Sequence, residues 1–163
     1  MAETFEEFFA RMLPRTIGVA RRVTGDPWTA EDVAVEAMAK AHARWARVGS
    51  LEWRDAWLLK VASREALRHL GRHPLLPVPT QAGDEADAVV LRRALAAALA
   101  HLPRRQRETV VLRYICDLSE PDVASALGVS AGTVKTHLHR ALASLRSSLG
   151  PDFEEGSVRE LHA

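Results

Sequence analysis

Residues 118–146 constrain the fold of this chain most strongly, because they predict two short helices joined by a tight turn. Ser119 and Asp122 have the three-residue spacing of a capping box, which predicts the start of the first helix. Gly128 predicts its end, since glycine adopts the left-handed conformation of a helix C-terminus without steric cost. Ser130 then predicts the cap of a second helix. This pattern is typical of a helix-turn-helix.

The second of these helices has two faces of different chemistry. Apolar residues at i, i+4, i+7 and i+11 predict its buried face, and they are Val134, Leu138, Ala141 and Leu145. The other side carries hydroxyl, imidazole and cationic groups suited to the major groove of duplex DNA. This groove-facing set is Ser130, Thr133, Lys135, Thr136, His139 and Arg140. An ordinary helical hairpin with a solvated polar face is the alternative, and we favour the DNA-binding interpretation.

The distribution of charge supports this interpretation. The formal net charge of the chain is only +1, but residues 90–149 carry an excess of five positive charges. Residues 73–89 and residues 150–163 each carry an excess of three negative charges. A surface that binds phosphates requires a local cationic excess, and that excess coincides with the predicted helix-turn-helix.

Other features of the sequence exclude several classes of function. Cys116 is the one cysteine, so the chain forms no intramolecular disulfide and has no thiolate cluster for a metal. His69 and His73 have a helical ligand spacing, but no third ligand is evident, and no phosphate loop or nucleophile motif is present. We therefore expect no enzyme, no cofactor and no metal site. The absence of an apolar run of roughly 20 residues and the acidic N-terminus predict a cytoplasmic protein without membrane insertion.

Helical periodicity extends along most of the chain, and we find no strand pattern and no internal repeat. Before residue 72 it predicts three helices. The first spans residues 5–23, and Pro14 is expected to kink or divide it. The second spans residues 27–48, and the third spans residues 53–70.

A break in this periodicity predicts the domain organisation. Residues 74–79 contain three prolines, and small and acidic residues follow them, which is typical of a flexible linker. Four more helices are expected after the break. We therefore predict an all-α fold of two small helical domains: a first domain over residues 1–71, a flexible linker over residues 72–86, a helix-turn-helix domain over residues 87–149 and an acidic, frayed tail over residues 150–163.

The third expected helix carries a basic ridge, which consists of Lys60, Arg64 and Arg68 at spacings of four residues. Such a ridge is either solvated surface or a contact for phosphates. Trp53 and Trp57 lie on or next to the same helix. Tryptophan most often packs in a core, and stacking on unpaired bases is its alternative use.

These residues resemble those of a known family. The segment LPRRQRETVVLRYICDLSEPDVASALGVSAGTVKTHLHRALASLR, residues 102–146, resembles the C-terminal promoter-binding domain of the sigma-70 family, especially its extracytoplasmic-function (ECF) group. Output domains of LuxR-type response regulators share the TVKTHLxxAL pattern. The N-terminal segments RRVTGDPWTAEDVAVEAMAKAHARW and WRDAWLLKVASREALRHLGR separate the two families. They resemble the domain of sigma factors that binds core polymerase and melts the promoter.

The resemblance implies a sigma factor that binds core RNA polymerase and promoter DNA and is regulated by an anti-sigma factor. It assigns the groove-facing set to the duplex −35 element. Matched position by position, the resemblance assigns polymerase binding to Asp32, Glu36 and Arg44. It assigns binding of the −10 strand to Trp53, Trp57, Lys60, Arg64 and Arg68. At Arg64 and Arg68 the chain departs from the family, which commonly has Asn and Asp there.

Two other functions remain open at this point. The chain could be a LuxR-type or other helix-turn-helix regulator that binds DNA without recruiting polymerase. It could also be a sigma-like interaction module whose main role is to bind a regulatory protein.

Overall fold

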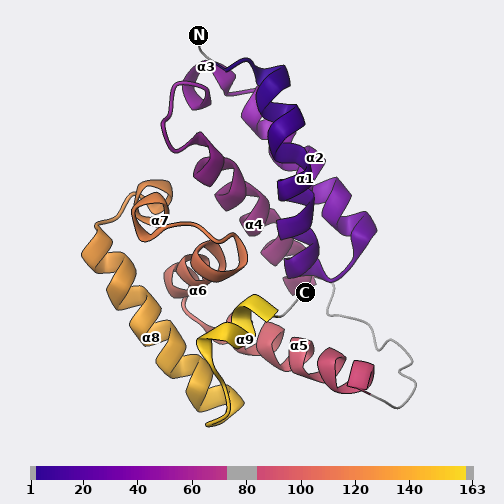
Figure 1. Ribbon diagram of the computed structural model, residues 1–163, viewed down its shortest axis with the longest axis vertical. Helices are drawn as coiled ribbons and strands as arrows, with labels where there is room; N and C mark the ends of the chain where they lie inside the picture. Colours follow the sequence, from indigo (N-terminus) through magenta and orange to yellow (C-terminus); the bar gives the residue numbers. More distant parts are fainter. Residues whose placement is uncertain (1–2, 73–83, 161–163) are drawn as a thin grey trace.

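A computed structural model describes residues 3–72 and 84–160, and every regular element within those residues is a helix (Figure 1). This confirms the all-α fold class. The N-terminal half, as we call it below, consists of α1 (Phe5–Thr24), α2 (Pro27–His42), α3 (Trp45–Val48) and α4 (Arg54–Arg72). The C-terminal half consists of α5 (Asp84–His101), α6 (Arg104–Val110), the π-helix η1 (Val111–Ile115), α7 (Glu120–Leu127), α8 (Ala131–Leu149) and α9 (Glu155–Glu160).

Residues 73–83, most of the predicted linker, lie outside the described residues. The helices on either side extend into the predicted linker range, because α4 ends at Arg72 and α5 begins at Asp84. The flexible linker and the domain boundaries therefore stay a prediction.

In the N-terminal half, α1, α2 and α4 pack against one another around a core that includes Phe8, Met12, Leu58 and Leu59. Of the two outcomes expected at Pro14, a kink or a division, the helix is not divided, because α1 continues through the proline. Proline removes one helical hydrogen bond, but the opposite side of α1 is buried along its length. Packing thus outweighs the missing bond.

The helix expected over residues 27–48 is interrupted. α2 ends at His42, and the short α3 begins at Trp45 after a turn. After this turn, the Trp45 ring packs against Phe5 and Phe8, with centroid distances of 5.4 Å and 5.0 Å. Aromatic contacts between distant segments therefore accompany an interruption that local periodicity did not predict.

In the C-terminal half, the segment after Pro103 begins as α6 and widens into η1, where we had expected one regular helix. Val110, Val111 and Leu112 are consecutive and all buried. Burial on every side is possible because η1 contacts α1 and α4 of the N-terminal half as well as α7 and α9 of its own half. In Figure 1, α6 and α7 lie between α4 and α8, and α8 forms the outer edge of the molecule.

The acidic tail is not frayed over its described residues, so this expectation was also wrong. It forms α9, which packs on η1. Phe153 and Val158 are 7% and 1% exposed, respectively. These two apolar side chains anchor a segment whose overall acidity suggested a solvated end.

We expect Leu138→Ala to lower the free energy of unfolding by about 2–5 kcal/mol, because it leaves a cavity under α8. The Leu138 side chain is buried, whereas Lys135 on the same helix is exposed. Lys135→Ala is therefore the matched control, with an expected change below about 0.5 kcal/mol. Urea denaturation of both variants measures the difference. Equal stability of the two variants would contradict the predicted orientation of α8.

Candidate nucleic-acid interface

The helix-turn-helix forms as its sequence predicts. Ser119 Oγ accepts a hydrogen bond from the Asp122 backbone N–H at 3.2 Å and caps α7. Gly128 ends α7 with φ 67°, in the left-handed region. Ser130 Oγ accepts from the Thr133 backbone N–H at 3.1 Å and caps α8. The predicted apolar stripe, Val134, Leu138, Ala141 and Leu145, is buried.

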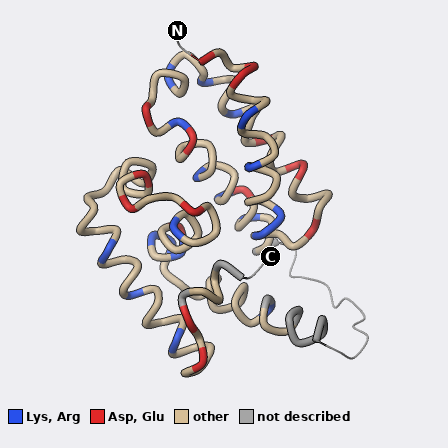
Figure 2. The backbone as a smooth tube through the Cα atoms, viewed as in Figure 1, with Lys and Arg blue, Asp and Glu red and all other residues tan. Residues whose placement is uncertain are grey.

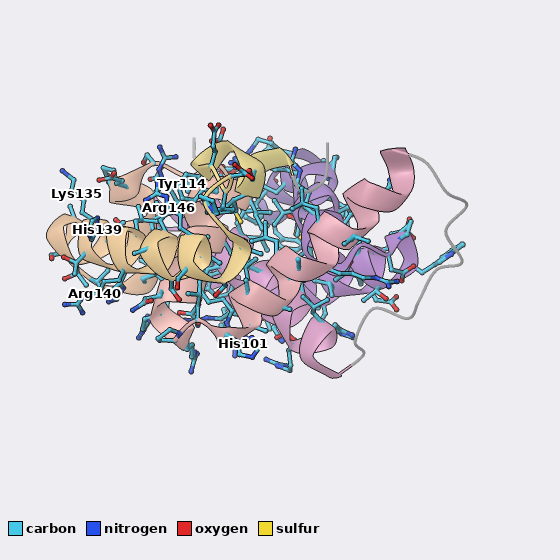
Figure 3. The ribbon with its side chains drawn as sticks, turned by 90° about the horizontal axis from the view of Figure 1, so that it is seen from below. His101, Tyr114, Lys135, His139, Arg140 and Arg146 are labelled. Atoms are coloured by element: carbon cyan, nitrogen blue, oxygen red, sulfur yellow. The ribbon has the colours of Figure 1, made fainter. Side chains whose placement is uncertain are left out.

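The groove-facing set lies on the outer surface of α8. Lys135, His139 and Arg140 project from the outer part of this helix into solvent (Figure 3). Ser130 and Thr136 are also exposed, and Thr133 is half-buried. Figure 2 shows the basic positions spaced along α8 at the edge of the molecule. The arrangement leaves this face of the helix open to a large partner.

The basic ridge of α4 lies instead against the C-terminal half. Lys60 Nζ donates to the backbone carbonyl of Ala126 in α7 at 2.6 Å. Arg64 donates from Nε and Nη2 to the two carboxylate oxygens of Glu108 in α6, at 2.8 Å and 3.2 Å. Arg68 forms an ion pair with Glu65 on its own helix at 2.8 Å. Two of the three ridge residues therefore join the halves of the chain.

Glu108 holds this contact together, and we had assigned it no role from the sequence. Its carboxylate is 5% exposed and also accepts hydrogen bonds from Arg104 at 3.0 Å and Arg105 at 3.5 Å. Burial alone would raise the pKa of Glu108, but hydrogen bonds from Arg64 and Arg104 outweigh it and hold the pKa below 4.5. The available signal was a carboxylate two residues before the apolar run Val110–Leu112.

Lys60 lies in a different electrostatic environment. Burial lowers its pKa, and the nearby positive charge of Arg64 lowers it further. Its ammonium group is 5.9 Å from the centroid of the Trp53 ring, which provides a cation–π contact. Trp53 and Trp57 are both half-buried and pack against the core. The structure thus brings Trp53 and the ridge together.

The residues assigned to polymerase binding lie on or beside α2. Asp32 and Glu36 are exposed, and Glu36 forms an ion pair with Lys40 at 2.9 Å. Lys40 in turn pairs with Glu65 of α4. We expected Arg44 on the same helix, but it lies in the turn after α2, because the helix ends at His42.

The exposed side of α2 also carries apolar residues to which we had assigned no role. Trp28 is 79% exposed and Val35 is 59% exposed. With Asp32 and Ala39 they recur at i, i+4, i+7 and i+11, so these four residues form one stripe, the α2 stripe. Exposed tryptophan next to other apolar surface is typical of a protein interface.

The parts of the chain that the structure describes contain no group of three or more His, Cys, Asp or Glu residues that could hold a metal ion. His73, one of the two histidines considered above, lies outside the described residues. Within those same parts, every helix is too short or too polar to cross a membrane.

The fold and its open helix-turn-helix define a DNA-binding protein with two helical parts. Sequence comparisons identify both parts. Residues 8–74 match the family model of sigma-70 region 2, and residues 92–145 match that of sigma-70 region 4. The chain is 35% identical to the RNA polymerase sigma-E factor of Streptomyces coelicolor over 89% of this chain and 85% of that protein. It is 33% identical to the ECF RNA polymerase sigma factor SigL of Mycobacterium tuberculosis, over 80% of each.

Solved structures agree with these matches. CnrH, in complex with the cytosolic domain of CnrY, superposes with a TM-score of 0.64 at 27% identity, over 91% of this chain and 89% of CnrH. The sigma factor RpoE of Bartonella quintana, in complex with the anti-sigma factor NepR, gives a TM-score of 0.58 at 25% identity, over 91% and 98%. The chain therefore belongs to the sigma-70 family, in its ECF group. Members of this family are transcription initiation factors, and the LuxR-type alternative is not supported.

Proposed function

We propose that this chain binds core RNA polymerase in the cytoplasm and directs it to specific promoters. The observation that carries this proposal is the combination of sigma-70 regions 2 and 4 in one chain with an open recognition helix. A regulator that acts on DNA alone has no need of region 2. The direct test is to add the chain to core polymerase and measure transcription from a cognate promoter.

In this proposal the groove-facing set reads the −35 element as duplex DNA. Lys135 and Arg140 are exposed on the sides of α8, suited to phosphates or guanine edges. Thr136 and His139 lie between them. Gly132 is exposed and has no side chain, so the backbone of α8 can approach the duplex closely at this position.

Lys135→Ala and Arg140→Ala should each weaken duplex binding without reducing stability, because both side chains are exposed. If the removed side chain contacts a base, its loss should cost roughly 1–3 kcal/mol of binding free energy and relax the sequence preference at one position. If it contacts only phosphate, its loss should lower the affinity for all sequences about equally. Fluorescence anisotropy on matched and mismatched duplexes distinguishes these outcomes. Full affinity in both variants would show that DNA binds another face.

Core polymerase, in this proposal, docks on α2. The α2 stripe supplies apolar contact area through Trp28 and Val35, and Asp32 and Glu36 supply negative charge. Arg44 lies just beyond the end of the helix and contributes a cation at that edge. A tryptophan surrounded by polar groups is the usual anchor of an interface with high affinity.

The −10 strand is assigned to Trp53, Trp57 and the basic ridge of α4. In the arrangement described above, Lys60 and Arg64 are engaged by Ala126 and Glu108, whereas the groove-facing set is open. We therefore infer that this closed arrangement can bind a −35 duplex but must open before the ridge contacts a single strand. When the chain opens on polymerase, the groove-facing set and the basic ridge of α4 can both contact DNA.

We further propose that an anti-sigma factor regulates the chain by holding such a closed arrangement. The support is the similarity to RpoE, which was solved with the anti-sigma factor NepR. An interaction module without polymerase activity is the remaining alternative. It predicts binding to a regulator but no transcript in the test described above.

A further inference from the structure

A hollow of about 340 Å³ lies between α4 and α6, where the two halves of the chain meet. Arg64, Leu67 and Arg68 line it from α4. Arg104, Arg107 and Glu108 line it from α6. The two halves thus contribute two arginines each, and neither half forms the hollow alone.

This hollow carries more positive charge than its own carboxylate balances. Glu108 accepts hydrogen bonds from three guanidinium groups, those of Arg64, Arg104 and Arg105. Arg107 donates to the carbonyl oxygen of Ala100 at 3.3 Å, a partner without net charge. Arg105 does not line the hollow, so the lining residues Arg64, Arg104 and Arg107, set against Glu108, leave an excess of two positive charges. Arg68 does not add to the excess, because Glu65 balances it.

The donors in this hollow suit an anion with several oxygens. A guanidinium has five N–H donors, and Arg104 uses Nε for Glu108 while Arg107 uses Nη1 for Ala100. One planar guanidinium group can donate two parallel hydrogen bonds to two oxygens of the same phosphate. The volume falls at the small end of the range for small-molecule sites. Arginines converging on one hollow suit a compact anion better than an extended strand, whose phosphates are spread along its length.

We propose that this hollow binds a compact oligophosphate, such as the phosphate chain of a nucleotide, and that the ligand holds the two halves of the chain together. Because both halves supply arginines, the site exists only in the closed arrangement. A ligand that binds only this arrangement shifts the population towards it. In terms of the proposed function, which this step assumes, the oligophosphate keeps Lys60 and Arg64 on their intramolecular acceptors and so opposes binding of the −10 strand.

The test uses inorganic tripolyphosphate as the probe and the full chain without polymerase. Isothermal titration calorimetry should show one binding site per chain. Arg104→Gln combined with Arg107→Gln should weaken binding at least about tenfold, the loss expected when charge-assisted hydrogen bonds are removed. Arg21→Gln combined with Arg47→Gln is the matched control, because it removes the same charge from two exposed side chains that do not line the hollow, and it should change affinity less than about twofold.

A second measurement tests the coupling. Tripolyphosphate should weaken the binding of a single-stranded oligonucleotide to the unmodified chain, and this effect should disappear in the Arg104/Arg107 variant. Arg107→Gln alone repeats both measurements if the double variant melts at a lower temperature.

Three results would overturn the proposal: no binding of tripolyphosphate, an equal loss in the two double variants, or oligonucleotide binding that tripolyphosphate leaves unchanged. Oligonucleotide binding that the Arg104/Arg107 variant weakens, with no binding of tripolyphosphate, would assign the hollow to nucleic acid. All of these measurements use the free chain, so a failure to recruit polymerase leaves their outcome unchanged.

Discussion

Replacing Glu108 with glutamine should open the closed arrangement and expose the basic ridge of α4. The substitution removes the negative charge that Arg64, Arg104 and Arg105 share. Hydrogen bonds to charged groups contribute roughly 1.5–3 kcal/mol each, and glutamine retains one acceptor oxygen. We expect closure to weaken by about 2 kcal/mol, which is a roughly thirtyfold change in the ratio of open to closed chains.

Two measurements check this result. Small-angle X-ray scattering should report a larger radius of gyration for Glu108→Gln, and anisotropy should report tighter binding of a single-stranded −10 oligonucleotide. Glu6→Gln is the matched control, because Glu6 is an exposed carboxylate on α1, far in the chain from the contacts with α6. Identical strand binding by Glu108→Gln and by the control would refute a role for Glu108 in closure.

The same contact predicts a dependence on pH. The arginines hold the pKa of Glu108 below 4.5 in the closed arrangement, so the closed form binds its proton less readily than the open form does. The contribution of Glu108 to closure is therefore complete above about pH 4.5 and is lost as the pH falls through the lowered pKa. Acidification should increase the radius of gyration of the unmodified chain, and Glu108→Gln should lack this transition.

Removing the two large apolar side chains of the α2 stripe, those of Trp28 and Val35, should have the largest effect on polymerase binding. Trp28 and Val35 are exposed in the free chain, so truncating them leaves the fold intact. Tryptophan anchors commonly contribute about 2–4 kcal/mol, so Trp28→Ala combined with Val35→Ala should weaken binding to core polymerase roughly thirtyfold to a thousandfold.

Val90→Ala combined with Leu91→Ala is the control for this experiment. These residues on α5 are 65% and 53% exposed, so their removal deletes a similar exposed apolar surface elsewhere. Biolayer interferometry with immobilised core polymerase compares the two variants. Unchanged affinity after loss of Trp28 and Val35 would place the polymerase contact on another surface.

The features that the sequence predicted well are those determined by neighbours within one or two helical turns. The caps at Ser119 and Ser130, the left-handed Gly128 and the buried side of α8 depend on spacings of three or four residues. Such spacings are visible in the chain itself. The helix-turn-helix and the open groove-facing set followed from them.

Features determined by distant contacts were missed. Arg64 and Glu108 are 44 residues apart, and Lys60 and Ala126 are 66 residues apart, so no local pattern pairs them. The basic ridge looked like an open surface because the acceptors of Lys60 and Arg64 lie on α7 and α6. The turn before Trp45 was missed for the same reason, since the aromatic partners of this residue lie in α1.

If this chain directs core RNA polymerase to specific promoters, run-off transcription will detect that activity. The purified chain and core polymerase would be incubated with a library of promoter fragments, and the transcripts would be sequenced. We expect discrete start sites that share a −35 and a −10 sequence, and that are lost when Lys135 and Arg140 are both replaced with alanine. Start sites no different from those of core polymerase alone, from a chain that still binds duplex DNA, would contradict this expectation.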